Sequence, residues 1–260
     1  MAKIIMFGNS KGGVAKTTTA VNTADILASL GNKVLLVDMD PQGHCSIALN
    51  YDPLRHFNTI ADVLIGAITI DKAVIEYRPS LHLIPSNINM FDTEEDLKKE
   101  ILSYFLLDRK LAPLVPKYDY ILIDTPPNIG TFVLNSLIAC QLLIVPVDSS
   151  FLGMEGYNRL EKVVTARIVP ATRKPIPIKI LLTLYDNRTR MSKDIRNVAM
   201  KKMGQDSVFT TVINRNTDVQ KSLSQGVPIR VFCQENKIKA AGLIDYESFV
   251  NELVHMTASM

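Results

Sequence analysis

Cysteine is scarce in this 260-residue sequence, which contains only Cys45, Cys140 and Cys233. The three lie far apart and form no C-x-x-C pair, which argues against a disulfide framework, a zinc site or an iron–sulfur site. Each cysteine is expected to be a small buried hydrophobic residue in a protein of the reducing cytosol. Only Cys45 lies near a candidate site.

Charged residues are absent from residues 125–147. A membrane-spanning helix needs about 20 mainly apolar residues, but prolines and polar residues interrupt this run along its length. A buried helix followed by a buried strand explains it better. Residues 1–10 contain too short an apolar run for a signal peptide. Internal repeats, low-complexity tracts and linkers are also lacking, so we expect a single domain over residues 1–260.

Charge is unevenly distributed, although the net charge is only +3. Residues 173–239 contain fourteen Lys/Arg and five Asp/Glu, a balance of +9, which leaves −6 for the rest of the chain. A basic C-terminal third is typical of a polyanion-binding face. A solvated helix surface would have the same composition, so charge alone leaves both interpretations open.

Apolar runs alternate with helical patterns along the chain. Strands are predicted at Lys3–Phe7, Lys33–Asp38, Leu81–Pro85, Tyr120–Asp124, Leu142–Val147, Ile178–Leu184 and Val208–Ile213. Helices are predicted at Thr17–Leu30, at Thr93–Leu107 with Thr93 and Asp96 as a capping pattern, at Leu134–Cys140, at Gly156–Val169, between the last two strands, and at Ala240–Met256. The pattern predicts an α/β fold, a doubly wound and mostly parallel sheet with helices on both faces.

A glycine-rich loop, SKGGVAKTT, follows the first predicted strand and opens the first predicted helix. It fails the usual phosphate-loop pattern G-x-x-x-x-G-K-(S/T), because Ser10 and Ala15 occupy the two glycine positions. The context still suits a phosphate, since glycine amides and a helix N-terminus favour anions. Lys16 would reach the β- and γ-phosphates, and the hydroxyl of Thr17 would bind Mg²⁺. A plain glycine turn would not explain two lysines and three threonines here.

Carboxylates follow two further predicted strands. In KVLLVDMDPQG, Asp40 is a candidate for orienting a water on the γ-phosphate, and Asp38 could support Mg²⁺ or Lys16 indirectly. Asp-Pro-Gln-Gly could also be only a turn. In YILIDTPPN, Asp124 ends its strand as a Walker B aspartate does and would hold Mg²⁺ through water.

These stretches together resemble the ParA family of partition ATPases, within the group that has the deviant Walker A motif (K/R)-G-G-x-x-K-(S/T). Residues 11–17 satisfy that motif in full. The segments 38–43 and 124–127 match the family's switch I and Walker B regions, and 150–160, 182–190 and 211–228 resemble its later landmarks. The resemblance covers essentially the whole chain and implies a P-loop NTPase fold.

The resemblance implies binding of ATP and Mg²⁺, a homodimer with two sandwiched nucleotides, and slow hydrolysis to ADP and phosphate. Lys11 would cross to the partner's phosphates and act in catalysis with Lys16 and Asp40. Metal binding would fall to Thr17, Asp124 and Asp38. The nucleotide-binding set would be Lys11, Gly12, Gly13, Val14, Ala15, Lys16, Thr17, Thr18 and Asn214.

The family also implies that the ATP dimer binds DNA without sequence preference. Arg188 and Arg215 carry over by position as DNA contacts, and binding of this kind should weaken steeply with salt. A ParB-like partner would stimulate hydrolysis and release the protein from DNA. We therefore expect a cytoplasmic, nucleoid-associated protein that does not bind membrane.

Two residues depart from the family pattern. Ala15 replaces the glycine of most members; if the position needs a positive φ, alanine is strained by about 1 kcal/mol, whereas a helical position costs little. Asn214 stands where the family usually has proline, in a segment that approaches the adenine. The base contacts and the turnover rate are therefore open questions.

Other members of the superfamily are alternatives. A MinD-like positioning ATPase shares the nucleotide motifs but ends in a basic amphipathic helix, whereas residues 240–256 contain three acidic residues and no Lys or Arg. An iron–sulfur carrier would need further cysteines, and a tyrosine kinase of this fold would need a C-terminal tyrosine cluster. A slow or non-hydrolysing nucleotide-switch scaffold stays possible if Ala15 disables hydrolysis.

Overall fold

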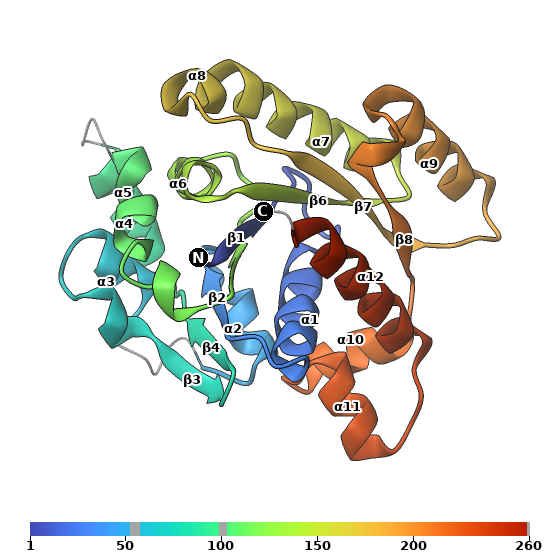
Figure 1. Cartoon of the computed structure of the whole chain (residues 1–260), viewed down its shortest axis with the longest axis horizontal. Coiled ribbons are helices and arrows are strands. Elements are labelled where there is room, and N and C mark those ends of the chain that lie inside the picture. Colours follow the sequence, from blue (N-terminus) through green and yellow to red (C-terminus); the bar gives the residue numbers. More distant parts are fainter. Residues whose placement is uncertain (53–57, 99–102, 259–260) are drawn as a thin grey trace.

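An eight-stranded sheet runs through the computed structural model, which describes residues 1–52, 58–98 and 103–258 (Figure 1). Its strand order is β3-β4-β2-β5-β1-β6-β7-β8. The strands are β1 (Lys3–Phe7), β2 (Val34–Asp38), β3 (Ile75–Arg78), β4 (Leu81–Ile84), β5 (Tyr120–Asp124), β6 (Leu142–Asp148), β7 (Ile178–Tyr185) and β8 (Val208–Asn214). Every pair is parallel except β3 with β4. The predicted α/β, mostly parallel architecture is confirmed.

Helices cover both faces of this sheet (Figure 1). They are α1 (Lys16–Ser29), α2 (His44–Ala48), α3 (Ile60–Leu64), α4 (Met90–Leu97), α5 (Leu106–Leu111), α6 (Thr131–Ala139), α7 (Phe151–Val163), α8 (Val169–Thr172), α9 (Arg190–Met203), α10 (Thr217–Ser224), α11 (Ile229–Asn236) and α12 (Ala241–Thr257). Side chains of α3–α7 and α9 pack in one hydrophobic core, and those of α1, α2, α11 and α12 pack in the other.

The central strands contribute to both cores, because successive side chains of a strand point to opposite faces. In β1, Ile4 and Met6 pack on the α6–α7 side while Ile5 and Phe7 pack on the α1–α12 side. This explains why the central strands are continuous runs of Val, Ile and Leu. Residues 125–147 form a buried helix and strand as predicted, and no described helix is long and apolar enough to cross a membrane.

Two helix predictions were wrong in their bounds. The predicted helix Thr93–Leu107 is instead α4 and α5, with residues 99–102 outside the described ranges, and Thr93 is buried inside α4 rather than capping it. The predicted helix Gly156–Val169 begins earlier, because the side chain of Ser150 accepts the backbone N–H of Gly153 and caps α7. After α7 the helix continues as a π-helical segment, Val164–Ile168.

The sequence patterns also missed β3 and the short helices α2, α3, α10 and α11. Each spans only four to eight residues, too few for a clear periodicity. The helix predicted at Leu134–Cys140 is α6, which begins three residues earlier at Thr131, and α8 was not predicted. The other predicted elements lie within a residue or two of their bounds. Because β1, β2, β5 and β6 are parallel neighbours in register, their carboxyl ends meet at one edge of the sheet, where ligands of such folds bind.

Candidate functional site

The loop between β1 and α1 turns through two residues with left-handed backbone. Gly13 has φ of 73°, and Ala15, the residue that precedes α1, has φ of 62° and ψ of 33°. Left-handed backbone costs a non-glycine residue about 1–2 kcal/mol. The sequence left open whether position 15 needs a positive φ or a helical backbone. The structure shows a positive φ, so the backbone of Ala15 is strained.

This loop is held in place by side chains that sequence reasoning missed. The Asn9 amide donates to the carbonyl oxygen of Pro146 at 2.7 Å and accepts the backbone N–H of Lys11 at 3.0 Å. From β7, the Thr183 hydroxyl donates to the carbonyl oxygen of Val14 at 3.0 Å. A Cβ at Gly156 would lie 2.0 Å from Asn9 Oδ1, so α7 approaches closely only because that position is glycine. Of these side chains, only Asn9 lies next to the loop 10–18 in the sequence, and its position was the one sequence feature that could have indicated a role.

Lys16 lies at the start of α1 with only 7% of its surface exposed. Its ammonium donates to the carbonyl oxygen of Lys11 at 3.0 Å, across the curve of the loop. Burial lowers the pKa of Lys16, although the carboxylates of Asp124 and Asp40 act in the opposite direction. A buried cation enclosed by a glycine-rich loop is suited to bind an anion.

Asp124 ends β5 and is completely buried. Neither of its carboxylate oxygens has a hydrogen-bond partner among the described residues. Burial raises the pKa of Asp124 to about 7, while the Thr17 hydroxyl and the Lys16 ammonium act to lower it. Thr17 is thus close enough to influence the carboxylate, without a hydrogen bond of ordinary geometry between them. A buried, unpartnered carboxylate beside a hydroxyl is unstable alone and fits a cation.

A divalent cation would need further ligands at this position. Among the described residues, no three His, Cys, Asp or Glu side chains are grouped to hold a metal ion. Mg²⁺ usually binds through one or two carboxylates together with water and substrate phosphates. Asp124 and Thr17 fit that partial donor set, with phosphate oxygens and water as the remaining ligands.

Asp38 and Asp40 lie on the next strand end and have different surroundings. The carboxylate of Asp38 is fully buried and accepts the backbone N–H of Asp40 at 3.1 Å and the backbone N–H and hydroxyl of Ser46 at 3.1 and 3.0 Å. Burial raises its pKa well above the usual range. Asp38 thus anchors the loop between β2 and α2, and its predicted indirect support of a metal stays a prediction.

A cavity of about 600 Å³ connects the glycine-rich loop, Lys16 and Asp40 with the C-terminal part of the chain. At one end it is lined by the loop and the first turn of α1, and at the other by β8, α10 and α12. The lining includes Gly12, Gly13, Ala15, Lys16, Thr17, Thr18, Asp40, Ile213, Asn214, Asn216, Val219, Gln220, Leu223 and Tyr246. The structure therefore brings Asn214 to the same cavity as the loop residues, and its contact with a nucleotide base stays a prediction.

Lys11 faces away from this cavity in the single chain. Its ammonium contacts the Asp148 carboxylate at 2.6 Å and the Ser150 hydroxyl at 2.8 Å. Ser150 also donates to Asp148 at 2.9 Å and caps α7. Asp148 was not predicted from the sequence, and Ser150 was noted only as the first residue of the family-like segment 150–160, without a role.

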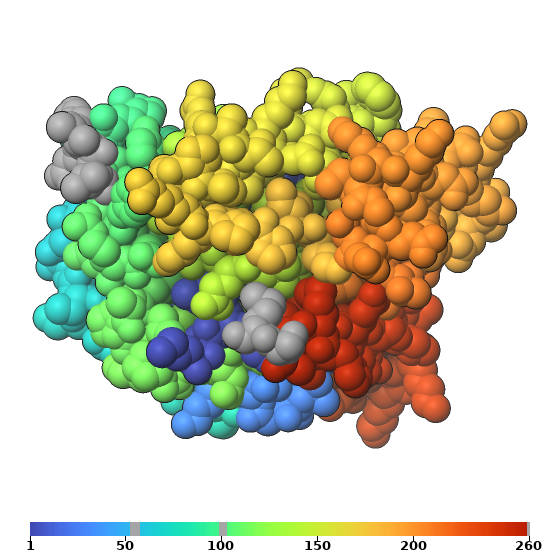
Figure 2. All heavy atoms as spheres, turned by 45° about the horizontal axis from the view of Figure 1, so that its top comes forward, coloured from blue at the N-terminus to red at the C-terminus, as the bar shows by residue number. Residues whose placement is uncertain are grey.

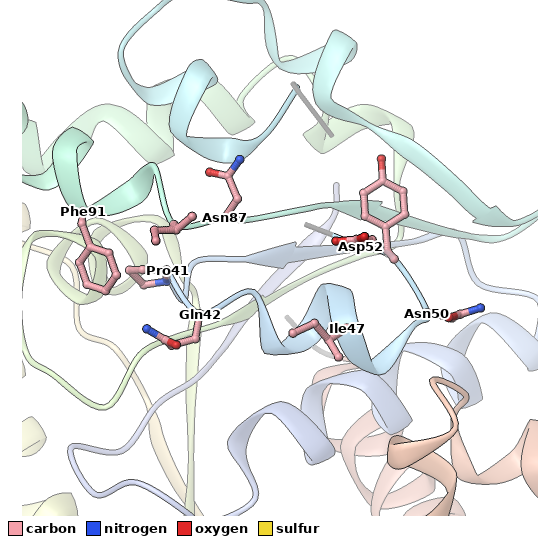
Figure 3. Close-up of a pocket in the computed structure, with 9 residues that line it drawn as sticks. Pro41, Gln42, Ile47, Asn50, Asp52, Asn87 and Phe91 are labelled. Atoms are coloured by element: carbon pink, nitrogen blue, oxygen red, sulfur yellow. The ribbon is translucent and has the colours of Figure 1, made fainter. Parts of the chain in front are cut away.

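A second hollow, of about 520 Å³, lies on the other side of the loop that carries Asp40 (Figure 3). Figure 3 shows Pro41 and Gln42 from that loop, Ile47 from α2, and Phe91 from α4 around it. Gln42 and Ile47 line both hollows. The Asp40 loop is thus a thin wall between them.

The basic third of the chain includes a corner of the molecule formed by α9 and the segments around it (orange in Figure 2). Arg188 is exposed, and its guanidinium makes two hydrogen bonds to Asp186, at 2.9 and 2.8 Å. The pKa of Asp186 is lowered to about 2, mainly by Arg188 and further by the charge of Arg215. Both predicted DNA-contact residues therefore act on the same carboxylate, although they are 27 residues apart in the sequence.

Comparisons with known proteins agree with this geometry. A family model described as an AAA domain matches residues 2–176. The chromosome-partitioning ATPase Soj of Treponema pallidum is 34% identical over 257 residues, which cover 98% of each chain. The chromosome partitioning protein ParA of Caulobacter vibrioides is 32% identical over 256 residues, covering 97% of this chain and 94% of its own. The chain belongs to the ParA/Soj family.

A solved structure has the same fold. It is described as cobyrinic acid a,c-diamide synthase from Mycobacterium smegmatis, with a bound ATP analogue and magnesium. Its TM-score is 0.81 at 28% identity, covering 100% of this chain and 98% of that one. The predicted P-loop NTPase fold and the family resemblance are confirmed, and the roles of individual site residues stay predictions.

Proposed function

We propose that this chain is an ATP-dependent DNA partition ATPase that works as a nucleotide-controlled dimer. The observation that carries the proposal is a pair of buried charges where the glycine-rich loop opens α1: the Lys16 ammonium, which lines the cavity, and the nearby Asp124 carboxylate, which has no hydrogen-bond partner among the described residues. ATP would supply phosphate oxygens for the Lys16 ammonium, and Mg²⁺ would supply a cation for the Asp124 carboxylate. Family membership and the ligands of the solved relative support the same assignment.

In this proposal the chain's own residues have separate roles. Lys16 and the loop amides hold the phosphates, and Asp124 and Thr17 hold the metal through one direct or water-mediated contact each. Bound Mg²⁺ would neutralise charge on the β- and γ-phosphates. Asp40, whose carboxylate lies in the cavity and also accepts the backbone N–H of Gln42 at 2.9 Å, would orient the attacking water. Val14 contributes through its backbone, since its side chain is fully buried.

Dimerisation would require Lys11 to leave Asp148 and Ser150 and to reach the phosphates of a second copy. That exchange links nucleotide binding to assembly, since Lys11 adds positive charge at the transferred phosphate only when a partner is present. The dimer would present Arg188 and Arg215 to DNA phosphates without reading base sequence. A centromere-binding partner of the ParB kind would then stimulate hydrolysis and release.

A DNA titration tests this function. We expect wild-type protein to bind mixed-sequence DNA with ATP but not with ADP or without nucleotide, and to lose at least about tenfold in affinity between 50 and 200 mM salt. Arg215→Ala should weaken DNA binding while ATP binding stays unchanged, whereas Arg109→Ala, an exposed arginine on α5, should change neither. DNA binding that is independent of ATP, or insensitive to salt, would contradict the proposal.

Hydrolysis is tested by measuring phosphate release under the conditions of the DNA titration. Asp40→Ala should keep ATP-dependent DNA binding but abolish phosphate release, so that the protein stays on DNA. A wild type that shows no turnover with DNA and a partner present would instead favour the non-hydrolysing scaffold. Loss of ATP binding in Asp40→Ala would show that Asp40 holds nucleotide rather than water.

A further inference from the structure

The end of the cavity farthest from the glycine-rich loop carries an amide whose orientation is fixed by a carboxylate. Asn214 ends β8, and both its backbone N–H and its side-chain NH₂ donate to Oδ2 of Asp245 on α12, at 2.8 and 3.1 Å. A carboxylate only accepts hydrogen bonds, so the NH₂ group must be the one that faces Asp245. The amide oxygen of Asn214 accepts no hydrogen bond from the described residues, and it is the polar atom left for a ligand.

A second amide at this end has the opposite orientation. Oδ1 of Asn216 accepts the backbone N–H groups of Asp218 and Val219, at 2.8 and 3.2 Å, and so caps α10. A Cβ at Gly242 would lie 3.1 Å from Asn216 Cγ, so α12 packs closely against this side chain. Its NH₂ group is therefore the part free to donate, and the cavity end offers one acceptor and one donor.

A cavity end that offers one acceptor and one donor suits adenine better than guanine. Adenine presents an exocyclic N6 donor next to the N7 acceptor, whereas guanine presents two acceptors, O6 and N7, along the same edge. Guanine O6 would face the amide oxygen of Asn214, and two acceptors cannot form a hydrogen bond. Such a site rejects the wrong base because that base leaves a polar group of the site without a hydrogen bond.

We propose that Asn214, held in one orientation by Asp245, makes this cavity select adenine over guanine nucleotides. The inference rests on the proposed nucleotide-binding function and assigns its base selectivity to this pair. A proline at position 214 has neither the backbone N–H nor the amide, so the contact depends on the residue by which this chain departs from the family pattern. Asp245 acts as a positioning residue and Asn214 as the residue that touches the base.

Competition between ribose-labelled fluorescent ATP and GTP, each with Mg²⁺, tests the pair. Wild type should prefer ATP by about tenfold or more, the effect of one hydrogen bond made or left unpaired. In Asp245→Ala the amide can rotate and present its NH₂ group to guanine O6, so the preference should fall to about threefold or less, mainly through tighter GTP binding. Asn214→Ala should also lose the preference, through weaker ATP binding, while the backbone contact to Asp245 is kept.

The chain offers a matched control on the same helix. Glu252 of α12 accepts the backbone N–H groups of Thr210 and Thr211 of β8, at 2.7 and 2.9 Å. Glu252→Ala thus removes the same kind of helix-to-strand clamp away from the cavity, and it should keep the wild-type ATP preference. If Asp245→Ala fails to fold, as judged by circular dichroism, Asn214→Ala decides the matter alone.

The outcomes separate the two proposals. A wild type that binds neither nucleotide overturns the proposed function. A wild type that binds ATP and GTP equally, an Asn214→Ala or folded Asp245→Ala variant with full selectivity, or a Glu252→Ala variant that loses as much selectivity, overturns only the role of the Asn214–Asp245 pair.

Discussion

The two ends of the nucleotide cavity are constructed differently. The phosphate end is lined by consecutive residues of one loop and by Asp40, which follows the end of β2, with Asp124 buried nearby at the end of the adjacent strand β5. The base end is formed by β8, α10 and α12, and its key contact joins residues 31 apart in the sequence. In our proposals, local backbone and charge determine whether a phosphate binds, whereas long-range side-chain orientation determines which base is accepted.

The largest expected effect tests the phosphate end. Lys16→Ala should weaken ATP binding by at least about 100-fold, because a buried charge-assisted contact to phosphate is lost. Lys11→Ala is the matched control, since the structure turns Lys11 toward Asp148 and away from the cavity. We expect Lys11→Ala to bind ATP within about threefold of wild type but to fail to dimerise. Calorimetric titration checks the first statement and sedimentation the second.

An equal loss in both lysine variants would contradict this separation of roles. It would mean that Lys11 contacts the nucleotide held by its own chain, so that the contact with Asp148 is only one of its positions. Base-end variants provide the comparison, because Asp245→Ala should change the ratio of ATP to GTP affinity without abolishing nucleotide binding.

A smaller effect is expected from releasing Lys11. Asp148→Ala removes an ion pair whose side chains are 25% and 18% exposed, and such a pair contributes about 1 kcal/mol. Both chains of a dimer release Lys11, so the gain is about 2 kcal/mol per dimer, and dimerisation with ATP should occur at roughly 30-fold lower protein concentration. Sedimentation measures this in an Asp40→Ala background that prevents turnover. Asp148→Asn keeps an oxygen acceptor for Lys11, so it should dimerise at a protein concentration between those of wild type and Asp148→Ala. Weaker dimerisation in Asp148→Ala would show that the carboxylate is needed in the dimer itself.

Much of the phosphate end could be predicted from sequence because its chemistry is local. Lys16, Thr17, Asp40 and Asp124 each lie within a few residues of a strand end that an apolar run makes visible. A parallel sheet then brings those strand ends together without any long-range information. The sheet itself followed from the same buried runs, and the single antiparallel strand, β3, was missed because its four residues are only partly buried.

The residues that support the site could not be predicted, because their contacts are not local in the sequence. Asp148 is one of many acidic residues until the fold places it 2.6 Å from Lys11. The side chain of Asp245 was read only as part of an acidic helix face, yet it orients Asn214. Hydrogen bonds between segments far apart in sequence depend on register and helix position, which composition and periodicity do not determine.

The smallest expected effect concerns the strained residue of the loop. Ala15 is held at φ of 62°, so Ala15→Gly relieves left-handed strain but makes the unfolded chain more flexible. We expect a net gain of about 0.5–1 kcal/mol in the free energy of unfolding, or roughly 2 °C in melting temperature. Ala28→Gly, in the helical part of α1, is the control with opposite sign and should lose about 1 kcal/mol. A destabilised Ala15→Gly would mean that position 15 does not adopt left-handed backbone, and faster turnover in a stabilised one would show that this strain slows the ATPase.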